Sequence, residues 1–246
     1  MPSASSRAAE RPARDPSATS CRKAQGVAAQ GVAVVSACAS EFGEEFCGDL
    51  RRLMEWRRDV RRFRIDPVDE VVLRAALDAF DLAPSVGNSQ PWRLVRVESA
   101  QARRMVRESF ERCNAEALAA TDPARADLYA RLKLSGLREA PVQLAVFCDA
   151  ATDQGHGLGS RTMPEALVHS VSGAVALFAL CARAHGLGVG WVSILDPDEV
   201  TAALDVPADW TLVSYLCIGY PCEADDVPEL ERAGWQSRKA TSLLMR

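Results

Sequence analysis

Three arginines and one carboxylate fall within five residues, Arg57-Arg58-Asp59-Val60-Arg61, directly after an amphipathic run. The planar fork of donors on arginine suits phosphate oxygens, and free backbone donors at a helix end add to such a clamp. A phosphate clamp gains nothing from a negative charge in its middle, so Asp59 either neutralises an arginine or takes part in chemistry. A solvated charge run is the alternative interpretation of this stretch taken alone.

The residues on both sides of this arginine cluster predict helices. Before it, a helix is expected from Glu44, because apolar residues recur at the spacing of one helical face. These residues are Phe46, Leu50, Leu53 and Met54. After it, Asp66-Pro67 predicts a second helix that has Asp66 as N-cap, Asp69 in its first turn and its end at Ala83-Pro84. Its buried face is expected to hold Leu73, Ala76, Leu77 and Phe80.

A loop with a fixed path is predicted over Pro84-Ser85-Val86-Gly87-Asn88-Ser89-Gln90-Pro91-Trp92. Two prolines, a glycine and short polar side chains favour such a loop over a regular element. It would expose backbone donors and small hydroxyls to a ligand. A plain connector is the alternative, although Gln-Pro-Trp is unusual in a mere connector.

The middle of the chain predicts strands and a helical pair. A short strand is expected at 94–97, and the apolar run from Val142 to Cys148 predicts a buried strand. Between them, two polar, arginine-rich helices are expected at 99–121 and 123–139, broken at Asp122-Pro123. The pattern fits a lid over a site and a solvated helical pair equally well.

A long helix is expected from Pro164 to His185, after a glycine-containing loop at 149–162 that does not complete a nucleotide-binding spacing. This helix is apolar nearly all round from Val171 to Leu180, which is typical of a core or of a subunit interface. Gly186 is its natural C-terminal cap.

Glycines mark the entry into the next strand, Gly186-Leu187-Gly188-Val189-Gly190-Trp191-Val192-Ser193-Ile194, and let a group pack flat against the backbone. Ser193 either points into a site or is an ordinary strand serine. A short helix capped by Asp196 and a second buried strand at 211–218 follow. The segment from Pro228, with Trp235 and Arg238, has no core pattern of its own and is expected to pack on another surface.

Composition narrows the class of protein. The chain has 246 residues, 48% hydrophobic and 25% charged, which suits one or two globular domains. A net charge of −4 gives no electrostatic case for nucleic acid, and we expect no membrane span. The eight cysteines show no CxxC spacing, so we interpret them as small buried hydrophobes of a reduced, cytoplasmic protein. The three histidines form no metal-ligand pair at helical spacing, and no metal is expected.

Residues 1–44 differ from the rest of the chain. They are rich in Ala, Ser, Arg and Gln, with few aromatic residues, and we interpret them as a disordered tail before a domain at 45–246. Val27 to Ala39 is mildly apolar, like the hydrophobic part of a secretory signal. The Arg- and Ser-rich start is also similar to a transit peptide, so both targeting readings stay open.

The order of these pieces resembles the FMN-dependent nitroreductase superfamily, and within it most closely the 5,6-dimethylbenzimidazole synthase family. The resemblance runs from about residue 44 to residue 238. Besides the arginine cluster, it rests on Leu132-Lys133-Leu134-Ser135-Gly136-Leu137-Arg138-Glu139-Ala140-Pro141, on Gly188 to Pro197, and on Pro228-Glu229-Leu230-Glu231 followed by Gly234-Trp235. Generic nitroreductases usually carry serine where Asp59 stands, so Asp59 favours the synthase.

The resemblance implies an α+β fold, with a mostly antiparallel sheet surrounded by helices, in an intertwined homodimer that holds FMN at the subunit interface. It also implies that reduced FMN is a substrate. Oxygen is the co-substrate, and the flavin is fragmented to 5,6-dimethylbenzimidazole, the lower ligand of vitamin B12, and erythrose 4-phosphate. The reduced FMN is expected from a separate flavin reductase. The helices at 99–139 correspond to a lid that shields the reaction from water.

The resemblance also assigns residues to roles. Asp59 and Ser193 match the catalytic pair of the family, with Asp59 as general acid or base on the sugar side of the flavin. The residues expected at the flavin are Arg57, Arg58, Asp59, Val60, Arg61, Ser85, Gly87, Gln90, Pro91, Lys133, Leu134, Gly190, Trp191, Ser193 and Arg238. Among them, Arg57, Arg61 and Arg238 suit the phosphate by their own chemistry.

Two other functions stay open. An ordinary NAD(P)H-dependent nitroreductase or flavin oxidoreductase would keep FMN as a bound cofactor, and Asn88-Ser89 is closer to that group. A non-catalytic flavin-binding protein would bind reduced FMN without consuming it.

Overall fold

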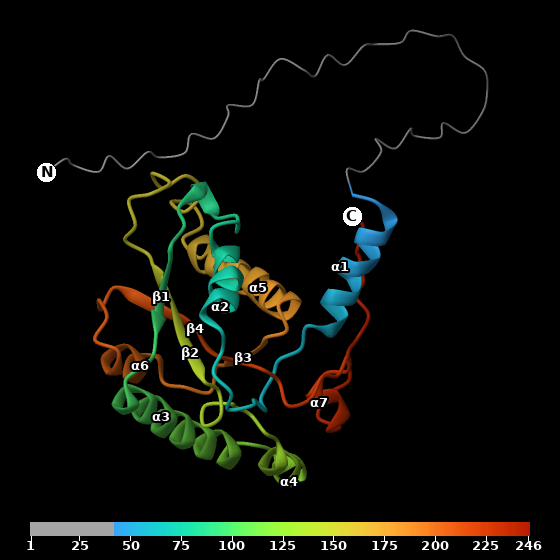
Figure 1. The fold of residues 1–246 in the computed structure, drawn as a ribbon. Coiled ribbons are helices and arrows are strands. Elements are labelled where there is room, and N and C mark those ends of the chain that lie inside the picture. The colour runs from blue at the N-terminus through green and yellow to red at the C-terminus, as the bar shows by residue number, and fades with distance from the viewer. Residues whose placement is uncertain (1–41) are drawn as a thin grey trace, which may run out of the picture. The chain divides into compact units, whose positions relative to one another are not determined.

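The computed structural model describes residues 42–246, so the predicted tail lies outside the described residues except for its last three positions. The described unit is built on one four-stranded antiparallel sheet with the strand order β1-β2-β4-β3 (Figure 1). Its strands are β1 (Trp92–Arg96), β2 (Val142–Asp149), β3 (Gly188–Val192) and β4 (Trp210–Gly219). Together with the helices around this sheet, the order confirms the α+β, mostly antiparallel architecture.

The two central strands form the core of the sheet. Seven of the eight residues of β2 are buried, and the register pairs Leu144 with Leu216. Continuous apolar sequence is needed there because both faces of the sheet are covered. Alternate residues therefore enter different hydrophobic clusters: Val146 packs with one group of helices, whereas Ala145 and Phe147 pack with the other.

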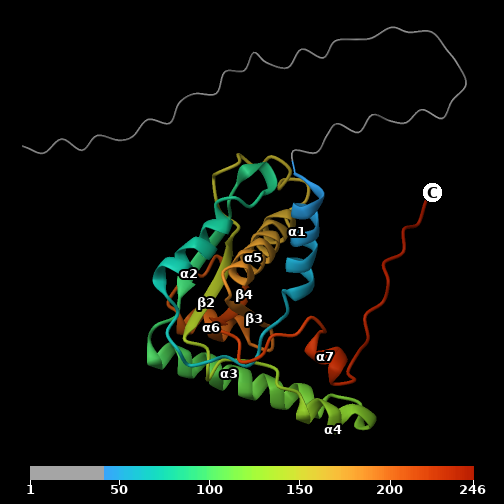
Figure 2. The same cartoon turned by 45° about the vertical axis from the view of Figure 1, so that its right-hand side comes forward.

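Helices lie on both faces of the sheet (Figure 2). One cluster joins the sheet to α2 (Glu70–Leu77), the short 3₁₀ turn Asp78–Phe80 and α5 (Ala166–Ala184). The other joins it to α3 (Ala100–Ala119) and α6 (Pro197–Ala203). The remaining helical pieces are α1 (Glu44–Trp56), the 3₁₀ turn Val86–Asn88, α4 (Pro123–Arg131) and α7 (Glu229–Arg232).

α5 has the expected position and ends as predicted. Val171 and Phe178 are fully buried against the sheet, whereas Val168 and Leu177 on its other side are exposed. Gly186 adopts φ +80°, and the amide of Leu187 donates to the carbonyl of Ala182 at 2.9 Å, which is a Schellman cap. Among the described residues, α5 is the one helix long and apolar enough to cross a membrane, with a mean hydropathy of 1.6.

α1 forms where predicted, but none of its residues is buried within the chain. Its apolar face is left open: Phe46 is 49% exposed, Leu50 37% and Met54 51%. The helix contacts α5, whose outer apolar residues are also exposed. The two helices together present an apolar surface that residues 42–246 of one chain leave exposed.

The second helix begins later and ends earlier than predicted. Its N-cap is Asp69, whose side chain accepts from the amide of Val71 at 2.7 Å, whereas Asp66 pairs with Arg64 at 2.8 Å. Both aspartates offer a capping oxygen, and the sequence pattern selected the wrong one. The predicted buried face is correct for Leu73, as it is for Ala76 and Phe80.

The two helices at 99–139 are also broken where predicted. Asp122 caps α4 by accepting from the amide of Ala124 at 2.8 Å, but α4 ends at Arg131 rather than at 139. Residues 132–140 instead return to the sheet as irregular backbone. Trp235 of the C-terminal segment packs on α4, with its ring 6.0 Å from the ring of Tyr129, as expected for a segment that packs on another surface.

The six described cysteines are free, and burial separates them. Cys148 and Cys217 are buried, in agreement with the prediction of small buried hydrophobes. Cys47 and Cys222 are exposed, so the prediction is wrong for these two. Within residues 42–246 no group of three or more metal-ligating side chains comes together.

Candidate active site

The arginine cluster leaves α1 as extended backbone and runs along the outer edge of β3. Asp59 forms a parallel bridge with Val189, and the amide of Val60 donates to the carbonyl of Val189 at 3.0 Å. This approach requires glycine on β3, because a Cβ at Gly190 would lie 2.1 Å from the carbonyl oxygen of Val60. The glycine-rich strand predicted from sequence therefore serves backbone contact with residues 59–60.

Both oxygens of Asp59 are held within the chain. The backbone amide of Trp191 donates to Oδ1 at 2.7 Å, and Nε of Arg61 donates to Oδ2 at 2.9 Å. The side chain of Arg61 is 13% exposed and that of Asp59 is 36% exposed. Nη1 of Arg61 also donates to the carbonyl of Lys133 at 3.1 Å. Asp59 thus has a fixed orientation and one exposed side. Arg61 uses two of its donors in hydrogen bonds to Asp59 and to the carbonyl of Lys133.

A cavity of about 600 Å³ opens beside Asp59. It lies against α1, the second half of α5, the start of the arginine cluster and β3. Its lining consists of Arg51, Met54, Glu55, Arg57, Arg58, Asp59, Val175, Ala176, Ala179, Leu180, Val189, Trp191 and Arg238. No residue of α1 or α5 was assigned to a site from the sequence. The apolar surface of α5 was the sequence feature that could have indicated this part of the lining.

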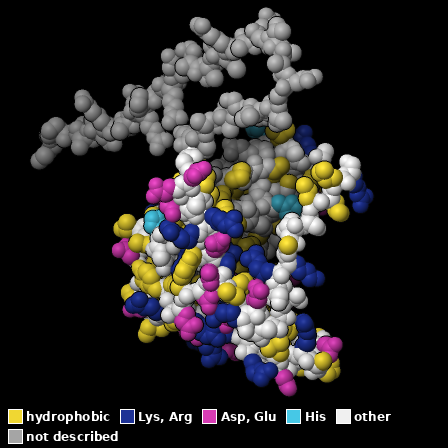
Figure 3. All heavy atoms as spheres, turned by 90° about the vertical axis from the view of Figure 1, so that its right-hand side faces the viewer, with side chains coloured by type: hydrophobic (Ala, Val, Ile, Leu, Met, Phe, Trp, Pro, Cys, Tyr) yellow, Lys and Arg dark blue, Asp and Glu magenta, His cyan; other side chains and the backbone are white. Residues whose placement is uncertain are grey.

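The arginines of this cavity make it electropositive. Nε of Arg58 donates to the carbonyl of Asp226 at 2.7 Å, which anchors that side chain at the cavity wall. Burial, followed by repulsion from Arg57 and Arg238, lowers the pKa of Arg58. Three guanidinium groups that repel one another favour a bound anion between them. On the face that carries α1 and α7, basic side chains lie interspersed with acidic ones (Figure 3).

The loop predicted at 84–92 has a defined path but lies outside the lining of the cavity beside Asp59. Oγ of Ser85 accepts from the amide of Gln90 at 2.9 Å, and Gly87 and Gln90 adopt φ +57° and +43°. The amide of Val86 donates to Oγ of Ser170 at 3.0 Å, near the start of α5.

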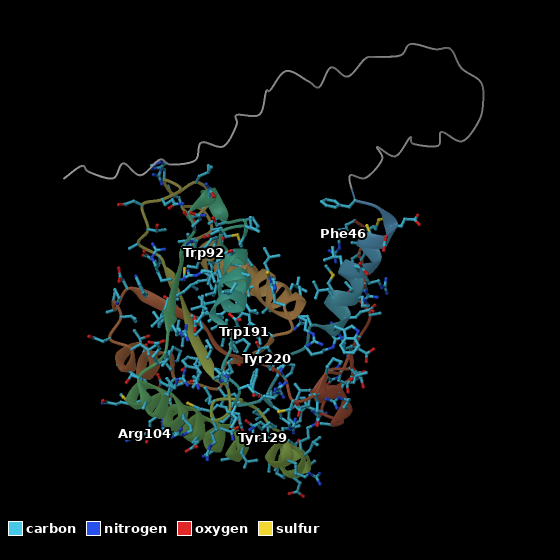
Figure 4. All side chains as sticks on the ribbon, viewed as in Figure 1. Phe46, Trp92, Arg104, Tyr129, Trp191 and Tyr220 are labelled. Atoms are coloured by element: carbon cyan, nitrogen blue, oxygen red, sulfur yellow. The ribbon has the colours of Figure 1, made fainter. Side chains whose placement is uncertain are left out.

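The cavity instead contacts α5 at Val175 to Leu180. At 1.5 Å per residue, Ser170 and Ala179 lie roughly 13 Å apart along the helix axis. In Figure 4, Trp92, which follows the loop, lies apart from Trp191 of β3. One chain therefore does not bring Ser85, Gly87, Gln90 and Pro91 into the cavity of Asp59.

The other predicted residues lie at two further places. Ser193 follows the end of β3 and is exposed, outside the lining of the cavity. Lys133 and Leu134 line a separate cavity of about 270 Å³ under α3. Nζ of Lys133 pairs with Glu139 at 2.6 Å, and Lys133 meets Asp59 only through Arg61.

The donor set of the large cavity fits FMN. Arg57, Arg58 and Arg238 supply donors for a phosphate, and Ala176 and Ala179 offer a flat apolar wall for a ring system. The volume falls within the usual range of roughly 300–1,000 Å³ for ligand sites.

Comparison with known proteins supports the resemblance to the nitroreductase family. Residues 54–220 match the model of the nitroreductase family. The chain is 60% identical over 205 residues to a 5,6-dimethylbenzimidazole synthase of Rhodospirillum rubrum, covering 83% of this chain and 97% of that one. It is 47% identical over 192 residues to a protein of the same name from Rhodobacter capsulatus, covering 78% and 93%.

A solved structure supports the fold. The structure of iodotyrosine deiodinase bound to FMN and 3-iodo-L-tyrosine superposes with a TM-score of 0.62 at 24% identity, covering 80% of this chain and 97% of that one. With the family model matched over most of the described unit and with relatives this similar, the chain belongs to the nitroreductase family.

Proposed function

We propose that this protein is a 5,6-dimethylbenzimidazole synthase, which uses oxygen to fragment reduced FMN into 5,6-dimethylbenzimidazole and erythrose 4-phosphate. The relatives of that name support the assignment at up to 60% identity. The structural observation that carries it is the carboxylate of Asp59, fixed by two hydrogen bonds at the edge of an arginine-lined cavity.

In this proposal, Arg57 and Arg238 bind the phosphate, because both line the cavity beside the anchored Arg58. The flat wall of α5, together with Trp191, receives the ring. Bound reduced FMN supplies both the electrons for oxygen and the carbon atoms of the product. Arg61 contributes indirectly, since its guanidinium group is committed to Asp59 and to the carbonyl of Lys133.

Asp59 is proposed to move protons during carbon–carbon bond cleavage. Its orientation is fixed by Trp191 and Arg61, while 36% of its side chain is exposed and the residue lines the cavity. A carboxylate at fixed distance from a bound substrate serves as general acid or base. Ser193 is proposed as the second polar group, and α3 and α4 as the lid that excludes water.

We propose that the active unit is a homodimer paired along α1 and α5. The apolar residues that these helices leave exposed, among them Phe46, Leu50 and Leu177, would be buried there. In this proposed two-fold dimer, the partner's loop 84–92 lies against the cavity of Asp59. Ser85, Gly87 and Gln90 would then reach the flavin from the partner, although one chain keeps them apart from Asp59.

Mixed dimers test this arrangement. Asp59→Asn in one chain and Gln90→Ala in the other leave one intact site in each mixed dimer and place both changes in the other site. Combining two inactive parents should therefore recover about a quarter of the normal activity, because half of the dimers are mixed and each has one working site. Recovery would not occur if each site were built within one chain.

The reaction itself is tested by incubating the protein with FMN, a separate flavin reductase and oxygen, and by identifying the aromatic product by mass. Formation of 5,6-dimethylbenzimidazole with loss of flavin supports the proposal. Steady NAD(P)H oxidation with intact FMN would support the alternative of an ordinary flavin oxidoreductase, and binding without consumption a storage role. The reductase and the cytoplasmic location are part of the proposal, the latter in keeping with free cysteines at the six described positions.

A further inference from the structure

Two polar side chains lie fully inside the sheet, far from solvent. Tyr215 of β4 is 0% exposed and Gln143 of β2 is 1% exposed. The hydroxyl of Tyr215 donates to Oε1 of Gln143 at 2.8 Å, and Nε2 of Gln143 donates to the carbonyl of Leu137 at 2.8 Å. Burial raises the pKa of Tyr215, so its hydroxyl remains a donor. Buried polar pairs of this kind are costly unless they form hydrogen bonds, and the amide nitrogen of Gln143 donates to irregular backbone.

The backbone that receives this donor is a compact turn, residues 133–140. The amide of Ala140 donates to the carbonyl of Gly136 at 2.9 Å, and Lys133 pairs with Glu139 at 2.6 Å across the turn. Gly136 is pressed against the ring of Phe63, where an added Cβ would lie 2.3 Å from a ring carbon. These contacts tie the two ends of the turn together and hold it against Phe63.

The other end of the same turn meets the candidate active site. The carbonyl of Lys133 accepts from Nη1 of Arg61 at 3.1 Å, and Nε of Arg61 donates to Asp59 at 2.9 Å. A continuous path of hydrogen bonds and the backbone of residues 133–137 therefore runs from the centre of the sheet to the carboxylate. Asp59 in turn accepts from the amide of Trp191 on the outer edge of β3.

We propose that Gln143 and Tyr215 are positioning residues that set the place of Asp59 through residues 133–140 and Arg61. Gln143 holds the turn at Leu137, the turn presents the carbonyl of Lys133, and that carbonyl fixes the guanidinium group against which the carboxylate is oriented. The proposal concerns geometry and rests on the proposed function only for its effect on product.

The first measurement does not depend on activity. β3 is an edge strand, and the amide of Trp191 points at Asp59 rather than at β4, so its hydrogen exchange reports whether the carboxylate is in place. Gln143→Met removes the bond to Leu137 at similar volume. The free energy of one hydrogen bond corresponds to about a tenfold equilibrium factor. If the loss of the Gln143 bond is passed in full to the bond between Asp59 and the Trp191 amide, that amide should exchange about tenfold faster. Tyr215→Phe, which leaves the bond to Leu137 in place, should show a smaller increase.

Two controls separate positioning from general loss of stability. Ser214→Ala removes a buried hydroxyl without a hydrogen-bond partner in the described structure, next to Tyr215 on the same strand. Val146→Ala creates a cavity in β2 on the opposite face of the sheet, in the other hydrophobic cluster. Both should leave the exchange rate of the Trp191 amide within twofold of the parent, although Val146→Ala lowers the melting temperature.

The second measurement is catalytic. In Gln143→Met, product formation should fall about tenfold while the Kd of FMN stays within twofold, because the arginines of the cavity are untouched. Val146→Ala and Gln143→Met are compared at an equal margin below their own melting temperatures. If both variants lose product formation and gain Trp191 exchange to the same extent, Gln143 has only a structural role. A parent that makes no product but shows the expected exchange pattern would overturn the proposed function and leave the positioning role intact.

Discussion

The substitution Asp59→Asn separates binding from chemistry at the candidate active site. The carboxylate faces two donors, the amide of Trp191 and Nε of Arg61. An asparagine side chain has one acceptor oxygen and one NH2 group, so it can satisfy only one of these donors. Because the Trp191 amide is fixed in β3, the oxygen should stay there and the NH2 group should turn against Arg61.

The energetic consequence follows from that lost ion pair. A hydrogen bond between charged groups contributes roughly 1.5–3 kcal/mol. The lower part of that range applies, because the Asp59 side chain is 36% exposed and water screens the pair. For a domain of this size, about 1.5 kcal/mol corresponds to a fall in Tm of roughly 3–6 °C. Loss of a general acid or base should reduce product formation by about 10²-fold.

The assay combines thermal melting, titration with FMN and chromatography of the product beside the flavin absorbance of the same sample. FMN should bind within a few-fold of the parent, since Arg57 and Arg238 are unchanged. Asp66→Asn is the matched control, because Asp66 pairs with the Nε of an arginine two residues before it at 2.8 Å, outside the cavity lining. Undiminished product from Asp59→Asn, or an equal loss from Asp66→Asn, would refute the proton-transfer role.

Three further predictions test other parts of the structure. Arg57→Ala should weaken FMN binding about tenfold, as expected for one charge-assisted bond, and should leave riboflavin binding unchanged; an equal effect on riboflavin would make the arginine structural. Gly190→Ala should lower Tm strongly, because the new Cβ would lie 2.1 Å from the Val60 oxygen, whereas Gly48→Ala, with nothing within 4 Å, should raise Tm slightly. Burial raises the pKa of Cys217 from 9.0 to about 12, so the protonated thiol stabilises the fold below pH 9 and this contribution is lost as pH rises toward 12. Urea titrations from pH 8 to 11 should show a shallower alkaline decline in Cys217→Ala; an unchanged slope would mean that the thiol is not protected.

Much of the fold could be predicted because its signals are local. The apolar run of β2 and the break at Asp122-Pro123 are visible in the sequence and appear in the structure. The sequence pattern predicts Asp66 as the N-cap of α2, three residues before the actual cap Asp69, because nearby aspartates compete for the same capping role. Tertiary contacts decide between them, and these are not visible in a local pattern.

The candidate site could be predicted only in part. The pairing of Asp59 with Arg61 was available from spacing, since residues two apart in extended backbone point to the same side. The distance between loop 84–92 and the cavity was not available, because it depends on where α5 lies. The path from Gln143 through residues 133–140 also needs three dimensions, since its members are far apart in sequence.

The contact between residues 59–60 and β3 has a second consequence, for solubility. β3 ends the sheet, and an uncovered strand edge invites pairing with the edge of another molecule. Asp59 closes part of this edge by accepting from the Trp191 amide, and Val60 closes another part through Val189. The proposed catalytic carboxylate therefore also occupies a backbone donor that another molecule's strand could otherwise pair with. Variants of Asp59 that lose activity should be checked for slow self-association. This check separates inactivity caused by an uncovered β3 edge from inactivity caused by loss of the proton-transfer group.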